Sequence, residues 1–243
     1  MNVITQVEEE ILTIRLNKPD RLNALDAGML AELTRAVEEE GANCRAIIIT
    51  GEGRGFCSGA DLAAMDSREG DALLRNFVNP AILALASAKV PTVAAVNGVV
   101  AGAGLGLALV ADIRIGSDLA GFVPAFAALG LVPDAGVTFL ARLRVGPGPA
   151  LRFLLSEHRT DAERALRMGF LDEVLPSSQL DEAARSVARQ FKFGDAVAAS
   201  ETVRLVRGRE FVEGLTHQLE AEAFTQEKMV ERQSGKMVRR DEA

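Results

Sequence analysis

Apolar runs with strand character alternate with segments of helical periodicity along the first 180 residues of the chain. Ile11–Leu16 is expected to form a hairpin with Gln6–Val7, with Glu8–Glu10 at the turn. Ala46–Thr50 is a continuous β-branched run, as expected of a strand that is buried on both faces. Further short strands are expected at Val90–Val96, Ile113–Ile115 and Gly121–Val123.

Helical patterns fill the intervals between these strands. Asp26 is the expected N-cap of a helix over about Ala27–Glu40, whose apolar stripe consists of Met29, Leu30, Leu33 and Val37. Other helices are expected at Ala72–Ala88, from about Gly104, and at Ala125–Leu129, Val137–Val145, Ala150–Leu155 and Asp161–Met168. The alternation predicts an α/β fold with a parallel sheet and crossover helices. From Asp181 the chain is helical and charged, which predicts a core at residues 1–180 and a helical region at residues 181–243.

Residues 90–111 form a 22-residue stretch without a charged side chain, and three of its four glycines recur at four-residue spacing. One interpretation is a membrane-spanning helix with a glycine packing face. Pro91, Asn97 and the glycines interrupt the stretch, however. A buried strand, a glycine turn and a buried helix explain it better, so no membrane partner is expected.

Composition and charge exclude several classes of partner. With 243 residues, of which 48% are hydrophobic, the chain can bury a large core. The net charge of -7 and the lack of a basic patch argue against nucleic acid. Cys44 and Cys57 have no metal-ligand spacing, so neither a metal site nor a disulfide framework is expected. The amino terminus lacks the basic and apolar regions of a signal peptide, and we expect a cytoplasmic protein.

Two loops of small residues carry the candidate chemistry. The first is Gly51-Glu-Gly-Arg-Gly-Phe-Cys-Ser-Gly-Ala-Asp-Leu-Ala-Ala64, and the second is Asn97-Gly-Val-Val-Ala-Gly-Ala-Gly-Leu-Gly106. Each follows an apolar run and precedes a helical pattern, so bare backbone N–H groups can approach a ligand and stabilise negative charge. Alternatively, the glycines serve close strand–helix packing. A dinucleotide fingerprint would need glycine at position 107 or 109, and both are leucine.

Five blocks in order resemble the crotonase (enoyl-CoA hydratase/isomerase) superfamily over roughly residues 3–225. They are Leu16-Asn-Lys-Pro with Leu22-Asn-Ala-Leu25, Gly55-Phe-Cys-Ser-Gly-Ala-Asp-Leu62, Lys89-Val-Pro-Thr-Val-Ala-Ala-Val-Asn-Gly98, Gly102-Ala-Gly-Leu-Gly106 with Ala111-Asp-Ile-Arg114, and Gly130-Leu-Val-Pro-Asp-Ala-Gly136. The resemblance implies a ββα spiral core and a C-terminal helical trimerisation region. It also implies a homotrimer or dimer of trimers that binds acyl-CoA thioesters, with coenzyme A as part of the substrate and no other cofactor.

Crotonases polarise the thioester carbonyl with two backbone N–H groups, which the resemblance places on Ala60 and Ala103. A thioester enolate concentrates negative charge on one oxygen, and two such donors stabilise it. The resemblance further places coenzyme A against Lys18, Arg21, Leu22, Ala24, Ser58, Ala60, Asp61 and Leu62. Lys18 and Arg21 can equally be solvated loop charges, and Asp61 can equally be a helix N-cap. An acyl pocket is expected from Leu62, Met65, Leu74, Phe77 and Phe126, all of which can equally belong to the core.

The two glutamates of the family's hydratases align here with Gly106 and Phe126, and neither residue can move a proton. Ordinary hydration is therefore not expected, because it requires a positioned water and a base. Asp134 is the remaining candidate, since its surroundings are similar to the isomerases of phenylacetate catabolism, in which an aspartate after Val-Pro is the sole acid/base. Apolar neighbours should raise its pKa toward neutrality. Alternatively, Asp134 is a turn residue that caps the helix starting at Val137.

Other chemistries fit the sequence less well. The related aroyl-CoA dehalogenases use a histidine and a tryptophan, but this chain has no tryptophan, and His158 and His217 lie in late helical segments. Ser58 lies outside a Gly-x-Ser-x-Gly elbow. We therefore expect an enzyme that isomerises 3-enoyl-CoA to 2-enoyl-CoA through an enolate. The alternatives are a hydratase or ring-opening lyase with relocated acid/base groups, and a catalytically silent acyl-CoA-binding paralogue.

Overall fold

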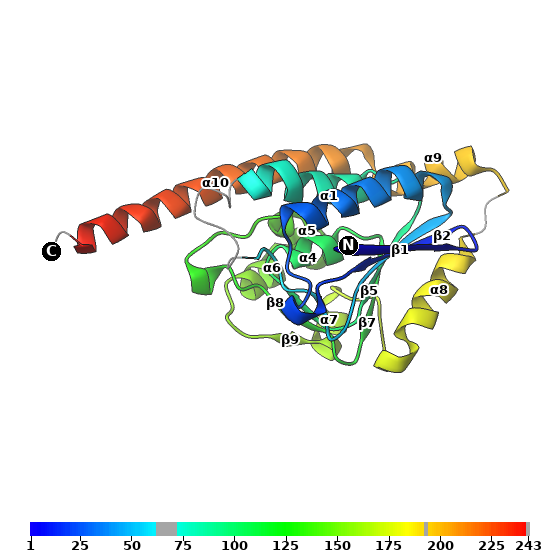
Figure 1. The fold of residues 1–243 in the computed structure, drawn as a ribbon, viewed down its shortest axis with the longest axis horizontal. Coiled ribbons are helices and arrows are strands. Elements are labelled where there is room, and N and C mark those ends of the chain that lie inside the picture. The colour runs from blue at the N-terminus through cyan, green and yellow to red at the C-terminus, as the bar shows by residue number, and fades with distance from the viewer. Residues whose placement is uncertain (62–71, 192–193, 242–243) are drawn as a thin grey trace.

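Two β-sheets form the centre of the molecule, and helices cover them (Figure 1). The structure is a computed structural model, and it describes residues 1–61, 72–191 and 194–241, with side chains as far as Gln233. The larger sheet has the strand order β1-β2-β3-β5-β7-β10, and the smaller sheet has the order β4-β6-β8-β9.

The larger sheet begins with the predicted antiparallel hairpin of β1 and β2, and its other pairs are parallel. Its strands are β1 (Val3–Glu8), β2 (Ile11–Leu16), β3 (Ala46–Gly51), β5 (Thr92–Val96), β7 (Ile113–Ser117) and β10 (Glu173–Leu175). Ile47 and Ile49 of β3 join the main core, whereas Ala46 and Ile48 belong to a second cluster on the opposite face. The prediction that this run is a strand buried on both faces is confirmed.

The smaller sheet consists mostly of strands that directly follow strands of the larger one. β4 (Gly55–Cys57), β6 (Val99–Ala101) and β8 (Gly121–Val123) pair in parallel, and β9 (Thr160–Asp161) is antiparallel to β8. Because β4 follows β3, β6 follows β5 and β8 follows β7, the chain repeats a strand–strand–helix unit. This repeat is the expected ββα spiral.

Helices pack on both faces of the larger sheet. In chain order they are α1 (Ala27–Arg35), α3 (Asn79–Ala86), α4 (Gly104–Leu109), α5 (Val137–Val145), α6 (Pro147–Leu154), α7 (Ala162–Met168), α8 (Leu180–Gln190), α9 (Ala196–Arg207) and α10 (Arg209–Asp241). Asp26 caps α1 as predicted, because its carboxylate accepts from Met29 N at 2.8 Å. α8 covers one face of the sheet, and α10 runs along the outside of the molecule, in contact with α3 and α5 (Figure 1).

Several short elements differ from expectation. β4, β6, β9 and β10 are not predicted by the sequence pattern, and each has at most three residues, too few to show a hydrophobic period. Ala125–Leu129, expected as a helix, contains only a 3₁₀ turn at Ala127–Leu129, entered through Ala125 at φ 59°. The helix expected at Ala150–Leu155 begins at Pro147, since proline suits the first turn of a helix.

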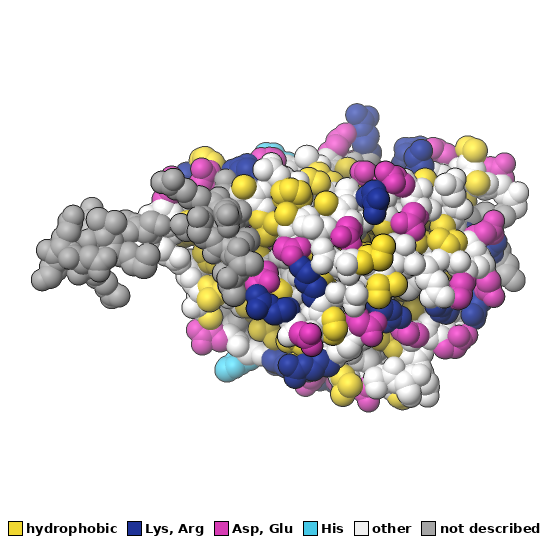
Figure 2. All heavy atoms as spheres, viewed as in Figure 1, with side chains coloured by type: hydrophobic (Ala, Val, Ile, Leu, Met, Phe, Trp, Pro, Cys, Tyr) yellow, Lys and Arg dark blue, Asp and Glu magenta, His cyan; other side chains and the backbone are white. Residues whose placement is uncertain are grey.

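The predicted helical region at residues 181–243 contains nearly all of α8 together with α9 and α10. The division into two regions at residue 180 stays a prediction. α8, which lies after this boundary, packs on the larger sheet, as helices before the boundary do. The uncharged stretch at residues 90–111 contains the expected strand and helix, β5 and α4, and between them lies β6, which is not expected from the sequence. In the described ranges, no helix combines the length and the apolar character needed to cross a bilayer. Basic and acidic side chains are interspersed on the face shown in Figure 2.

Candidate functional site

The two glycine loops meet beyond the carboxyl ends of β3 and β5. Loop 58–61 follows β4, and loop 102–104 leads from β6 into α4. A Cβ placed on Gly59 would lie 2.9 Å from Ala101 O and 3.2 Å from Ala103 N, so the two backbones are in contact. Gly59 also has φ 89°, in the left-handed region that favours glycine.

The two predicted amide donors, Ala60 and Ala103, have unpaired N–H groups. The neighbours of Ala60 are bonded instead, because Leu25 N donates to Gly59 O at 2.8 Å and Asp61 N donates to Leu25 O at 3.0 Å. Among the residues that the structure describes, neither the Ala60 nor the Ala103 N–H has an acceptor. Two free donors on contacting loops suit an oxygen that carries negative charge.

Two buried asparagine side chains hold the first loop in place. Asn23 is fully buried, and its Nδ2 donates to three backbone carbonyls within residues 52–56. Asn97 follows β5, and its Oδ1 accepts from Gly51 N at 3.1 Å. These side chains satisfy backbone groups that would otherwise be buried without a partner, so they fix the loop where no sheet ladder does. Neither residue is among the predicted site residues.

The segment at residues 18–26 lies beside loop 58–61. Ser58 N donates to Leu22 O at 2.9 Å, and Ser58 Oγ donates to Arg21 O at 3.0 Å. The structure thus brings together the predicted coenzyme A residues Lys18, Arg21, Leu22, Ala24, Ser58, Ala60 and Asp61. The two basic side chains are paired within the protein: Arg21 Nη2 donates to both oxygens of Asp61, at 2.8 and 3.0 Å, and Lys18 pairs with Asp26. Leu62 lies outside the described residues.

Asp134 lies in the turn before α5. Its Oδ1 is buried and has no hydrogen-bond partner in the described part of the chain, and its Oδ2 accepts a long bond of 3.4 Å from Gln226 Nε2. Burial raises the pKa of Asp134 to about 7, against the opposing effect of the Gln226 amide. The next residue, Ala135, packs against Gly106, one turn beyond Ala103 in α4. A carboxyl group that can gain and lose a proton near neutral pH therefore lies close to the second glycine loop.

The turn that carries Asp134 is held by α10. Glu222 of α10 accepts from Gly136 N at 2.7 Å, from Thr138 N at 3.0 Å and from the Thr138 hydroxyl. Gly136 is the N-cap of α5 and offers no side chain. The main-chain oxygen of Asp134 accepts from Val137 N at 3.0 Å, but its side chain accepts from none of the first amides of this helix. Asp134 is thus the turn residue of the alternative interpretation, but its side chain does not cap the helix, because Glu222 accepts from Gly136 N and Thr138 N instead.

Glu222 and Gln226 are not predicted as site residues by the sequence. Both continue the buried stripe of Leu215 and Leu219 at helical spacing, and they are only 4% and 9% exposed. Polar residues on the apolar stripe of a helix are the signal by which they could be found.

Comparison with known proteins supports the expected family. A family model described as enoyl-CoA hydratase/isomerase matches residues 6–240. The chain belongs to the enoyl-CoA hydratase/isomerase family.

Relatives and solved structures give the same result. A probable enoyl-CoA hydratase of Rhodobacter capsulatus is 38% identical over 195 residues, which cover 79% of this chain and 76% of that protein. A 1,2-epoxyphenylacetyl-CoA isomerase of Escherichia coli is 36% identical over 198 residues, which cover 77% of this chain and 74% of that protein. The crystal structure of an enoyl-CoA hydratase from Mycobacterium avium subsp. paratuberculosis has a TM-score of 0.85 at 28% identity, covering 94% of this chain and 93% of that one. This chain therefore has the crotonase fold.

In this member of the enoyl-CoA hydratase/isomerase family, the two positions that the resemblance aligns with the hydratase glutamates hold a glycine and a phenylalanine, Gly106 and Phe126. A Cβ on Gly106 would overlap Ala135 O and lie 2.8 Å from Ala135 Cβ, so the Asp134 turn fills the space that a side chain would need. Phe126 is 4% exposed and belongs to the main core. Of these three positions, only 134 holds a carboxyl group.

The residues expected to form the acyl pocket are described in part. Leu62 and Met65 lie outside the described residues. Phe77 is half-buried against the main core, and Leu74 and Phe126 are buried within it. Their role in binding an acyl group stays a prediction.

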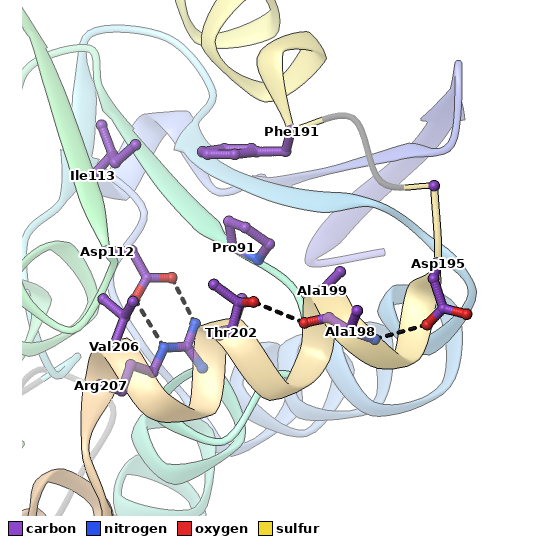
Figure 3. A pocket seen from close by; sticks show the side chains of 12 residues that line it. Pro91, Asp112, Ile113, Phe191, Asp195, Ala198, Ala199, Thr202, Val206 and Arg207 are labelled. Atoms are coloured by element: carbon purple, nitrogen blue, oxygen red, sulfur yellow. Dashed lines mark hydrogen bonds and ion pairs between the residues drawn. The ribbon is translucent and has the colours of Figure 1, made fainter.

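Other features lie apart from this site. A hollow of about 610 Å³ opens at the amino ends of β5 and β7, where Arg207 of α9 points toward Asp112 and pairs with it (Figure 3). It is thus at the opposite end of the parallel strands from the glycine loops. His158, expected in a helix, lies in an exposed bend, and His217 is exposed on α10. Over the described residues, no cluster of three or more side chains could hold a metal ion.

Proposed function

We propose that this chain isomerises 3-enoyl-CoA to 2-enoyl-CoA through an enolate. The observation that carries the proposal is the carboxyl group of Asp134, whose buried Oδ1 has no partner among the described residues and which lies close to a loop whose Ala103 amide has no acceptor among them either. An acid/base needs a pKa near the working pH, and an oxyanion needs preorganised donors. The relatives include a probable enoyl-CoA hydratase and a 1,2-epoxyphenylacetyl-CoA isomerase, so the choice of isomerisation over hydration rests on Asp134 and not on these names.

In the proposed reaction, the N–H groups of Ala60 and Ala103 donate to the thioester oxygen. The Asp134 carboxylate removes a proton from C2, and the electron pair of the broken C–H bond enters a dienolate whose charge rests on that oxygen. The same carboxyl group then returns the proton to C4, so the double bond moves from C3–C4 to C2–C3. Loss of one oxyanion donor typically costs about 10²–10³ in rate, which makes the two amides as important as the base.

Substrate binding is assigned to the surfaces around these groups. Coenzyme A would lie along the segment at residues 18–26 and loop 58–61, and the acyl group would lie toward Phe77 and Phe126. Because Lys18 and Arg21 are already paired with carboxylates, a phosphate bound there would replace one anion by another. No further cofactor is part of the proposal, since the proton is both removed and returned by Asp134.

A homotrimer or dimer of trimers is also part of the proposal. Large apolar side chains on the C-terminal helices are exposed in the single chain, namely Val197, Leu205, Val206 and Phe224. Exposed apolar side chains in one region are typical of a contact between subunits. Sedimentation equilibrium of the purified protein measures the number of subunits directly.

The test of the function is Asp134→Asn, which is nearly isosteric but cannot accept a proton. Conversion of a 3-enoyl-CoA to the conjugated 2-enoyl-CoA is followed by its absorbance, and we expect kcat to fall by about 10²–10⁴-fold, the usual effect of losing a general base. Asp181→Asn is the matched control, because this side chain is 63% exposed and lies on α8. Both variants should still bind coenzyme A in a calorimeter.

Three outcomes would contradict the proposal. An Asp134→Asn variant as fast as the parent would exclude this residue as the acid/base. Rapid hydration of 2-enoyl-CoA by the parent would indicate relocated hydratase groups. A parent that binds acyl-CoA but converts no enoyl-CoA would favour the catalytically silent paralogue.

A further inference from the structure

Glu222 is a buried carboxylate that the proposed reaction does not use. It comes from the middle of α10, yet its hydrogen-bond partners are Gly136 and Thr138, which follow Asp134 directly in the chain. Gln226, one turn later in α10, accepts from Val132 N at 3.1 Å on the other side of Asp134. One helix, α10, therefore forms hydrogen bonds to the turn on both sides of the aspartate.

Hydrogen bonds stabilise the ionised form of Glu222 more than that of Asp134. Gln218 Nε2 donates to Thr138 Oγ1 at 2.9 Å, so the Thr138 hydroxyl proton is free to point at Glu222. Glu222 then accepts three hydrogen bonds, and the amino end of α5 directs its amides toward it. Asp134 has one long hydrogen bond and one unpaired oxygen. Burial raises the pKa of both groups to about 7, and because two like charges repel, ionisation of one carboxyl group raises the pKa of the other.

The neighbouring elements supply no compensating cation. No lysine or arginine of the described residues contributes to the pKa of either carboxyl group, whereas burial and the charge of Asp134 both raise the pKa of Glu222. α3 and α4 have no charged side chain. The remaining charged groups on elements packed against α10 are Arg75 of the segment Leu74–Val78, Arg142 and Arg144 of α5, and Glu201, Arg204 and Arg207 of α9. On α10 itself, Glu220 and Glu227 pair with Arg75, and Lys228 lies over Phe224.

We propose that Glu222 is a positioning residue for the acid/base Asp134, holding the turn that carries it and placing a second carboxylate beside it. The inference rests on the proposed function, because only then does Asp134 exchange a proton with substrate. A neighbouring anion makes the Asp134 carboxylate a stronger base, as C2 of a thioester requires.

The test compares Glu222→Gln with Glu222→Asp and with Glu213→Gln. Glutamine keeps the size of the side chain and loses its charge, whereas aspartate keeps the charge on a shorter side chain. Glu213 is exposed on the same helix and pairs with Arg209 at 2.9 Å, so its glutamine variant is the matched control. The readouts are kcat and KM for a 3-enoyl-CoA over a range of pH, and the titration of the Asp134 carboxyl carbon by NMR.

We expect Glu222→Gln to move the acid limb of the kcat profile and the Asp134 titration to lower pH by about one unit or more. Each unit corresponds to a tenfold change in proton affinity. The plateau of kcat should fall by about tenfold, since a weaker base transfers the proton more slowly, while KM stays near that of the parent. Glu222→Asp should keep the acid limb in place, and Glu213→Gln should match the parent throughout.

A purely structural Glu222 would give another pattern. Glu222→Gln would then lower Tm and kcat but leave the acid limb and the Asp134 titration unmoved, which would overturn the inference. If Glu222→Gln does not fold, Thr138→Val removes one donor to Glu222 and should shift the Asp134 titration in the same direction by less. The NMR titration requires no turnover. An inactive parent would thus refute the proposed function while this experiment still decides the role of Glu222.

Discussion

Adding a single methyl group at Gly106 should both destabilise the protein and slow its reaction. A Cβ at this position would overlap the carbonyl oxygen of Ala135 and lie 2.8 Å from its Cβ, and Ile82 Cδ1 would be 3.1 Å away. The strongest clash is with backbone, which cannot move aside as the end of a flexible side chain can. Gly106→Ala therefore has to displace the turn that carries Asp134.

The magnitude follows from overpacking. Inserting a methyl group into a close-packed interior costs about 1–3 kcal/mol. For a protein of this size each kcal/mol lowers Tm by about 2–4 °C, so we expect a fall in Tm of about 2–12 °C. A catalytic group displaced by about 1 Å can lose about 10²-fold in rate, and kcat for a 3-enoyl-CoA should fall accordingly.

Gly148→Ala is the matched control, because a Cβ there meets no atom within 4 Å and the residue lies in the first turn of α6. It should leave kcat unchanged and raise stability by roughly 0.4–1 kcal/mol, since alanine restricts the unfolded chain. Differential scanning calorimetry and the conjugated-thioester assay provide both readouts. If Gly106→Ala and Gly148→Ala behave alike, the packing of Ala135 over Gly106 is wrong, and a glutamate could occupy position 106.

Two further predictions concern stability. Folding raises the pKa of Asp134 from 3.8 to about 7, so the folded state binds this proton more tightly than the unfolded chain. The stability that this proton contributes is fully present below pH 3.8 and is lost as the pH rises through about 7. Asp134→Asn should thus be more stable than the parent at pH 8, by up to roughly 4 kcal/mol, and similar to it near pH 4; equal urea midpoints at pH 8 would contradict this. Asn23→Ala removes a donor from the carbonyls of Glu52, Gly55 and Phe56, although Gly55 O still accepts from Asn97 Nδ2 at 3.1 Å, and should cost about 1–3 kcal/mol; an unchanged urea midpoint would show that the other carbonyls find new partners.

The elements that the sequence predicts well are those with a long hydrophobic period or a distinctive cap. β3 shows its burial on both faces as an unbroken β-branched run, and α1 shows its stripe and its Asp26 cap. The glycine loops are also readable, because Gly59 needs a positive φ and close backbone contact. These signals are local, so a single sequence contains them.

The features that the sequence does not predict depend on contacts between distant segments. Glu222 meets Gly136 across 86 residues, and no local pattern connects them. The packing of Ala135 on Gly106 is likewise tertiary, although it explains why position 106 carries no side chain. β4, β6 and β9 of the smaller sheet are too short to show a hydrophobic period and become strands through pairing with distant segments of the chain.

The order of these segments along the chain has a consequence for synthesis of the protein. Both glycine loops and the Asp134 turn lie before α8 in the chain, whereas Glu222 and Gln226, which hydrogen-bond to the turn, lie in α10. A growing chain lengthens by about 5–20 residues per second, so the turn leaves the ribosome several seconds before the part of α10 that binds it. A polypeptide ending after α9 would contain both amide donors and the aspartate, but it would lack Glu222 and Gln226, which bind the turn that carries Asp134. The ability to hold a thioester would therefore arise on the nascent chain before the ability to move its proton.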